Sequence, residues 1–142
     1  MSSPFEMNYE IPAEMLESQY QHLHHADVMR LLEKVRVQFL AELGLPQEEL
    51  LRQDCFLVLQ GCEVRFLREI KSESLRCTVE LISLEGNTGF RLKQEMLKAP
   101  KRLAVQAFFE LTAMSGVRRR RRELPEELQR LLLQNGSSAP SV

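Results

Sequence analysis

The sequence lacks paired cysteines, an excess of charge of one sign, and any long apolar run. No stretch approaches the roughly 20 apolar residues that a membrane-spanning helix needs, so no membrane span is expected. Nineteen Lys and Arg against twenty Asp and Glu give a formal net charge of −1, which argues against a nucleic-acid-binding protein. The start of the chain, MSSPFEMNYE, carries no basic residue and does not look like a secretory signal.

The three cysteines, Cys55, Cys62 and Cys77, are odd in number and form no C-x-x-C pair. This pattern predicts neither a disulfide framework nor a zinc site. We expect three buried free thiols in a reducing cytoplasm, with no metal and no cofactor.

The length and the hydrophobic content of the chain fit one compact domain. The chain has 142 residues, of which 44% are hydrophobic, enough for one core and too few residues for a second domain. We expect a single domain over residues 1–134. Residues 135–142, NGSSAPSV, are predicted to form a disordered tail.

Hydrophobic spacing predicts one helix of about 18 residues between His25 and Leu43. Six apolar residues recur there at intervals of three and four: Val28, Leu31, Leu32, Val35, Phe39 and Leu43. Gly44 and Pro46 are expected to end this helix. Glu33 and Arg36 lie three residues apart and could pair along it, and a last short helix is predicted over Leu124–Leu133.

Alternation with a period of two predicts five strands and an α+β fold. The first covers Phe5–Ile11, and four follow Gln53 as a predicted meander. Their expected core-facing residues are Phe56, Val58, Cys62, Val64 and Phe66; Leu75, Cys77, Val79 and Leu81; Phe90, Leu92 and Met96; and Leu103, Val105, Ala107, Phe109 and Leu111. Such a sheet leaves edges exposed, so we expect two copies to pair their edges, as a homodimer or homotetramer.

The segment Gln21–Leu45 resembles the helix signature of the acyl-CoA thioesterase family, which includes the 4-hydroxybenzoyl-CoA thioesterase-like enzymes. The matching residues are His22, Ala26, Leu32, Glu33, Arg36, Phe39, Leu40, Leu43 and Gly44. The resemblance implies a hotdog fold, in which a curled antiparallel five-stranded sheet wraps a long central helix. It also implies hydrolysis of an acyl-CoA or acyl-carrier-protein thioester.

The sequence departs from the family where the chemistry is expected. The family's usual catalytic Asp is replaced by Ser18, and its paired Asn residues are replaced by His24 and His25. The alternative is therefore a catalytically altered protein that binds an acyl-CoA or a protein partner without hydrolysis.

Thioester hydrolysis needs oxyanion donors and a group that activates water. The resemblance places the donors at the helix start, on the backbone N–H groups of His24, His25, Ala26 and Asp27. Candidates for the catalytic group are His25, His22, Ser18, Glu17 and Glu33. For each, the alternative is a purely structural residue of the loop or the helix.

Arg118–Arg122 form a run of five arginines after the last predicted strand. They are either solvated and balanced by the nearby Glu123, Glu126 and Glu127, or they bind phosphate. In the second case Arg118, Arg119 and Arg120 would contact the nucleotide part of coenzyme A, since guanidinium groups pair well with phosphate.

Overall fold

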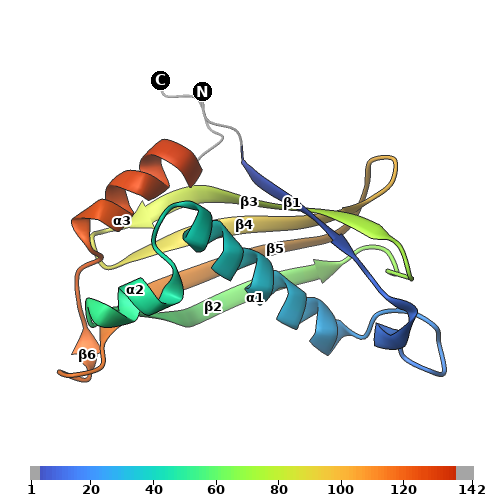
Figure 1. Cartoon of the computed structure of the whole chain (residues 1–142), viewed down its shortest axis with the longest axis horizontal. Helices are drawn as coiled ribbons and strands as arrows, with labels where there is room; N and C mark the ends of the chain where they lie inside the picture. Colours follow the sequence, from blue (N-terminus) through green and yellow to red (C-terminus); the bar gives the residue numbers. More distant parts are fainter. Residues whose placement is uncertain (1–3, 137–142) are drawn as a thin grey trace.

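A single curled antiparallel sheet forms the body of the protein, and one 18-residue helix lies across one of its faces (Figure 1). The computed structural model describes residues 4–136. Its elements, in chain order, are β1 (Phe5–Glu10), a 3₁₀ turn (Ala13–Met15), α1 (His25–Glu42), α2 (Gln47–Arg52), β2 (Phe56–Phe66), β3 (Ser74–Glu85), β4 (Gly89–Lys98), β5 (Arg102–Ser115), β6 (Arg120–Arg121), α3 (Glu126–Leu131) and a π-helical turn (Leu132–Gly136).

The predicted helix is present as α1, with its apolar stripe against the sheet. Val28, Leu31, Leu32, Val35 and Phe39 are all buried. Each such side chain contributes roughly 1.5–3 kcal/mol when it leaves water. Gly44, with φ of +93°, follows the helix in the left-handed conformation that glycine adopts without strain.

The strand order is β1-β3-β4-β5-β2, with β6 paired to β5. β3, β4 and β5 form the predicted hairpins, turning at residues 86–88 and 99–101. The predicted four-strand meander is wrong for β2, which pairs with β5 at the opposite edge from β1. Alternation identifies the two faces of a strand but carries no information about which strand lies beside it.

The prediction of which face of β2 points to the core is also wrong. The residues predicted to face the core include Phe56, Val58 and Phe66, which are 41%, 43% and 52% exposed. A bulge between Leu59 and Gly61 shifts the alternation, and β2 is an edge strand. Cys62 is exposed as well, so only Cys55 and Cys77 are the buried free thiols expected.

Three further features of the structure differ from what the sequence predicted. The sheet has six strands rather than five, because the two-residue β6 adds to β5. The six-residue α2 is not predicted by any periodic pattern. Residues 135 and 136 belong to the turn that follows α3 rather than to a tail, and the remainder of the predicted tail lies outside the described residues. No helix among residues 4–136 is long and apolar enough to cross a membrane.

Candidate functional site

The chain reaches the start of α1 through a tight loop over residues 17–22. The Glu17 N–H donates to the His22 carbonyl at 2.8 Å, and the Gln21 N–H donates to the Glu17 carbonyl at 2.8 Å. The Leu23 N–H then donates to the Ile70 carbonyl at 2.7 Å. This last bond fastens the loop to the segment 67–73, which connects β2 to β3.

The Glu17 carboxylate closes this loop. It accepts from the backbone N–H of Gln19 at 3.0 Å and of Tyr20 at 2.7 Å. These bonds to the charged form hold the pKa of Glu17 below its ordinary value, the Gln19 bond most strongly. Ser18 is exposed, and its carbonyl accepts from the Gln21 side chain. Neither residue lines a described pocket beside the helix start.

The His24 side chain caps α1. Its Nδ1 accepts from the Ala26 N–H at 3.1 Å, so this nitrogen carries no proton. The His24 carbonyl accepts from the N–H groups of Asp27 and Val28. Of the four predicted oxyanion donors, Ala26 and Asp27 are thus already occupied. The N–H groups of His24 and His25 have no acceptor within the described chain.

A pocket of about 510 Å³ lies between the start of α1 and the end of β2. It is lined by His22, Leu23, His24, His25, Val28, Phe66, Leu67, Arg68, Glu69, Ile70 and Val105. We call it the histidine pocket. The structure thus brings together all three histidines of the chain and the helix N–H groups.

The three imidazole rings in this pocket differ in the contacts and hydrogen bonds that hold them in place. The His24 and His25 rings lie 4.0 Å apart between centroids, and His25 meets the edge of Phe66 at 6.4 Å. His22 stacks on Tyr20 at 5.8 Å, and its Nδ1 is buried without a hydrogen bond within the described residues. His24 is committed to the cap. His25 is therefore the histidine whose exposed ring is free to act on a bound molecule.

Arg68 and Glu69 also line the pocket, although the sequence did not point to them. Hydrogen bonds to β5 hold their loop, because the Ala104 carbonyl accepts from the N–H groups of Leu67 and Arg68. Arg68 also donates from its guanidinium to the Leu103 carbonyl. No periodic pattern marks such a loop, so only the fold reveals that it faces the histidines.

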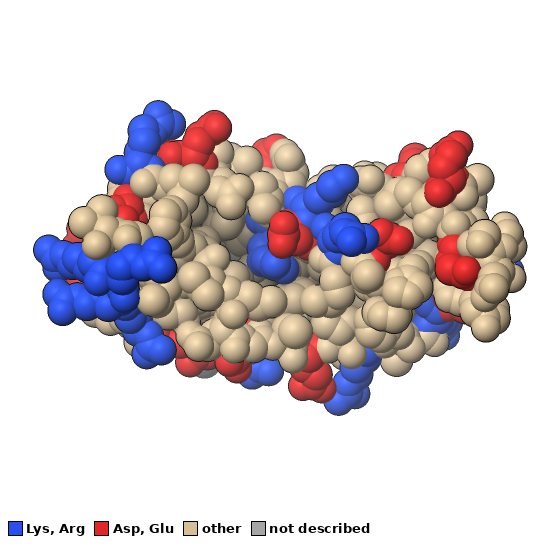
Figure 2. All heavy atoms as spheres, turned by 90° about the horizontal axis from the view of Figure 1, so that it is seen from below, with Lys and Arg blue, Asp and Glu red and all other residues tan. Residues whose placement is uncertain are grey.

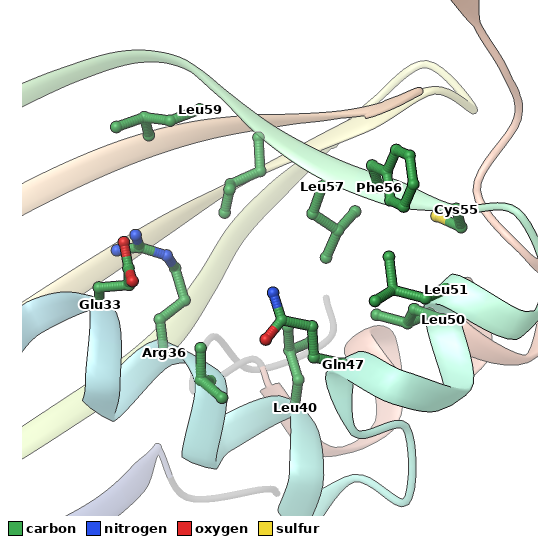
Figure 3. A pocket seen from close by; sticks show the side chains of 12 residues that line it. Glu33, Arg36, Leu40, Gln47, Leu50, Leu51, Cys55, Phe56, Leu57 and Leu59 are labelled. Carbon is green, nitrogen blue, oxygen red and sulfur yellow. The ribbon is translucent and has the colours of Figure 1, made fainter. Parts of the chain in front are cut away.

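A second, apolar pocket of about 290 Å³ lies between α1, α2 and β2 (Figure 3). Glu33 lines this pocket, two helical turns beyond His25, and does not line the histidine pocket. The Arg36 guanidinium projects beside Glu33 in Figure 3, but the predicted ion pair is not formed at 4.0 Å or less by these two described residues. Figure 3 also shows apolar side chains of α2 and β2 around the remaining space.

Arg36 instead bonds to the sheet. It donates to Gln94 Oε1 at 2.9 Å, and its guanidinium lies 4.4 Å from the centroid of the Phe109 ring. Gln94 in turn donates to the Leu32 carbonyl at 2.9 Å. Burial, the largest influence, lowers the pKa of Arg36 from its ordinary value. This buried network joins α1 to β4 and β5.

Arg118–Arg121 lie at the opposite end of the molecule from the histidine pocket, on the turn that follows β5 and on β6 (Figure 1). Asp54 organises this turn. Its carboxylate accepts from the Ser115 hydroxyl and from the N–H groups of Gly116 and Val117, at 2.8 and 3.2 Å. The Ser115 hydroxyl, chiefly, holds the pKa of Asp54 below its ordinary value.

These bonds predict a loss of stability in acid that depends on Asp54. Because its folded-state pKa is lowered, its contribution is present above its ordinary pKa of 3.8 and is lost as the pH falls through the folded-state value. We expect the free energy of unfolding, measured by urea titration from pH 6 down to about pH 2.5, to fall less steeply in Asp54→Asn than in the wild type. An unchanged slope would show that this carboxylate is not bonded as described. Glu14→Gln serves as the control, since the exposed Glu14 side chain forms no hydrogen bond or ion pair with the described residues.

Comparison with known proteins gives a family and several similar folds. A family model described as the thioesterase-like superfamily matches residues 16–132. None of the curated proteins matches the sequence.

Solved structures resemble the fold at low sequence identity. A hypothetical protein from Staphylococcus aureus, solved in complex with CoA, is 16% identical with a TM-score of 0.90, covering 100% of this chain and 89% of its own. A 1,4-dihydroxy-2-naphthoyl-CoA thioesterase from Synechocystis is 13% identical with a TM-score of 0.83, covering 92% and 96%. A probable thioesterase from Bartonella henselae is 19% identical with a TM-score of 0.76, covering 87% and 100%. The curled antiparallel sheet is consistent with the hotdog fold.

Proposed function

The chain belongs to the thioesterase-like superfamily, and from this premise we propose that it hydrolyses an acyl thioester of coenzyme A or of an acyl-carrier protein in the histidine pocket. One observation carries the proposal. Among the described residues no group accepts from the N–H of His25, which lies at the positive end of α1 in the same pocket as the His25 imidazole.

The proposed reaction needs water and no cofactor. The thioester carbonyl oxygen accepts from the His25 N–H, which stabilises the negative charge that develops there. The His25 imidazole removes a proton from water as the water oxygen attacks the carbonyl carbon. The carbon–sulfur bond then breaks, the proton passes to the sulfur, and a carboxylic acid and a free thiol leave.

His25 is the best-placed base among the candidates. Glu17 and Ser18 lie outside the histidine pocket, and Glu33 lines the other pocket. The Nδ1 of His24 is occupied by the helix cap. His22 is partly buried beneath Tyr20.

A second candidate function is binding of an acyl-CoA without hydrolysis. The observation that favours it is that Ser18 stands at the position of the family's usual carboxylate, and that neither Ser18 nor the neighbouring Glu17 lines the pocket. One experiment separates the two. Free-thiol release is measured with short, long and aromatic acyl-CoAs, and binding of the same compounds is measured by calorimetry. Release above the uncatalysed rate supports hydrolysis, whereas binding without release supports the second candidate.

We also propose a homodimer through the free edge of β2, the unit from which a homotetramer would be built. Among the described residues, β2 pairs only with β5, so one row of its backbone groups is left open. Phe56, Val58 and Leu59 on this strand are all more than 40% exposed. Pairing two such edges about a two-fold axis satisfies the backbone groups and covers the apolar side chains.

Chemical cross-linking through Cys62 tests whether the β2 strands of two subunits pair in this way. Gly61 is the middle residue of β2, so an axis near it places the Cys62 side chains of two subunits at about 7–8 Å, the diagonal spacing across paired strands. We expect a short bis-maleimide to join wild-type chains and to leave Cys62→Ser monomeric on a denaturing gel. Cys55 and Cys77 react slowly because they are buried, and burial raises the pKa of Cys77 to about 11. Equal cross-linking in both proteins would contradict the β2 dimer.

The two buried free thiols also support a reducing compartment, and we propose the cytoplasm.

A further inference from the structure

We propose that the turn after β5 docks the protein on an anionic membrane surface. Arg118–Arg121 face the negative groups of the lipids, and the Val117 side chain enters the headgroup region. We call residues 115–121 the basic turn. The inference goes beyond the proposed function, because it concerns the surface to which the protein binds and does not depend on hydrolysis.

Basic residues are concentrated at one place in the chain. Five of the nineteen Lys and Arg are Arg118–Arg122, whereas the other fourteen share the rest of the chain with all twenty Asp and Glu. Figure 2 shows a dense group of basic side chains at one end of the molecule, beside a largely uncharged surface. A protein with one basic end and an otherwise acidic body approaches a negative surface with the basic end forward.

The four guanidinium groups of the basic turn have no acidic partners within the chain. Arg118–Arg121 are exposed, and none of their side chains forms an ion pair with an acidic group in residues 4–136. The acidic residues that follow the run bind elsewhere, because Glu123 accepts from Asn87 and Glu127 faces Arg130. The charge of the turn is therefore available to an external anionic partner.

The basic turn is held in shape before any partner binds. The Asp54 carboxylate accepts from three groups of the turn, and the Arg118 N–H donates to the Ser115 hydroxyl at 3.0 Å. Arg119 has φ of +56°, a left-handed conformation that glycine adopts with less strain. A turn fixed in this way presents its side chains with little loss of backbone entropy on binding.

An apolar side chain lies at the tip of the basic turn. Val117 is 83% exposed, the largest fraction among the large hydrophobic residues that the structure describes. Leu51 of α2 is 45% exposed, and Arg122 connects this end of α2 to β6 by donating to the Gln53 carbonyl at 2.6 Å. Exposed apolar side chains next to basic ones are typical of protein surfaces that lie in the membrane interface.

The position of the basic turn suits an extended surface better than a small anion. Small ligands bind in concave sites, and none of the four arginines lines the histidine pocket or the apolar pocket. Met114 of β5 pairs with both Phe56 and Arg121, so β2 and β6 lie on opposite sides of β5. The turn projects at the end of the sheet, away from the free edge of β2 (Figure 1).

Nucleic acid fits the basic turn less well than a membrane does. Single-stranded nucleic acids bind to basic grooves that also carry aromatic side chains, on which the bases stack. Residues 115–121, SGVRRRR, contain no aromatic residue. A polar nucleic-acid backbone would also leave Val117 without an apolar environment, which a lipid headgroup region provides.

The first test measures co-sedimentation of the full chain with lipid vesicles. We expect binding to vesicles of phosphatidylcholine and phosphatidylserine in equal parts, and none to phosphatidylcholine alone. Changing Arg118, Arg120 and Arg121 to Ser and Arg119 to Gly should lower the affinity at least about a hundredfold, since each cation near such a surface contributes about fivefold. Glycine suits the backbone at position 119, and circular dichroism checks that the variant is folded.

A second four-residue variant is the matched control. Changing Lys34, Arg76, Lys101 and Arg130 to Ser removes the same charge from exposed positions on α1, β3, the turn after β4 and α3. Its affinity for the mixed vesicles should fall only a few-fold. Equal losses in the two variants would show that net charge rather than the basic turn is responsible, and would overturn the proposal.

Val117→Ser tests whether the turn enters the bilayer surface. The variant keeps every charge, and we expect its affinity for the mixed vesicles to fall about five- to tenfold, because one exposed apolar side chain no longer leaves water. Unchanged affinity would leave only an electrostatic contact, which any polyanion could make, and would overturn the proposal.

Binding of coenzyme A in solution tests the competing role of Arg118, Arg119 and Arg120. We expect calorimetry to give the same coenzyme A affinity for the wild type and for the four-arginine variant. Weaker coenzyme A binding by that variant, together with unchanged vesicle binding, would overturn the proposal in favour of a site for a soluble phosphate ester. Neither measurement requires thiol release, so a failure of the proposed hydrolysis would leave this test intact.

Discussion

Replacing His25 with alanine is expected to lower kcat for acyl-CoA hydrolysis by a factor of about 10² to 10⁴, the usual contribution of a general base. The substitution removes the imidazole from the histidine pocket but keeps the backbone N–H at the start of α1. Oxyanion stabilisation should therefore survive, and acyl-CoA should still bind. The expected signature is a large fall in kcat with a small change in substrate affinity.

Two carboxylate variants serve as controls for this measurement. Glu17→Gln and Glu33→Gln should both retain kcat within a few-fold, because neither residue lines the histidine pocket. Glu69 does line it, so Glu69→Gln provides the competing explanation. Full activity in His25→Ala, combined with loss of activity in Glu69→Gln, would show that the Glu69 carboxylate is the general base and that the His25 imidazole is not.

The largest expected loss of stability comes from Gln94→Leu, at about 3 kcal/mol. Gln94 is fully buried and is the hydrogen-bond acceptor of the Arg36 guanidinium, while its own amide donates to the Leu32 carbonyl. The leucine would leave the buried Arg36 guanidinium without its hydrogen-bond acceptor, while the Leu32 carbonyl would keep only its bond within α1. Urea unfolding followed by circular dichroism measures the loss.

The double variant Arg36→Met/Gln94→Leu tests the reason for that loss. Removing both polar groups together should recover most of the stability, because replacing a complete buried polar pair by apolar residues is often nearly neutral. Two independent, additive losses would show that packing rather than an unpaired charge is responsible.

The sequence predicted the elements that have one buried face. In α1 and in β3, β4 and β5, apolar residues repeat at the period of the element, and nearly all of them are buried. Gln94 is the exception, since it occupies a core-facing position of β4 and is polar. Its place in the core follows from Arg36, 58 residues away, and no local pattern contains that relation.

β2 could not be placed in the same way. Apolar residues on both of its faces and a bulge between Leu59 and Gly61 leave the alternation ambiguous. Its pairing with β5 instead of β3 depends on the path of residues 67–73. That path also brings Arg68 and Glu69 to the histidines, so the same missing information hid part of the site.

The candidate site was predicted in outline and altered in detail. The three histidines line one pocket at the start of α1, and their part in catalysis stays a prediction. The candidate groups did not all meet, because Glu17 bonds back to its own loop and Glu33 points to a second pocket two turns along the helix. The His24 cap could not be foreseen, because it depends on the orientation of one ring.

The location of the reaction is tested most directly by a crystal structure of the protein with an inert acyl-CoA analogue, in which a methylene group separates the sulfur from the carbonyl. The proposed function predicts that the analogue's carbonyl oxygen lies about 3 Å from the His25 backbone nitrogen, at the start of α1. An analogue whose carbonyl lies in the apolar pocket beside Glu33, away from the helix start, would contradict it.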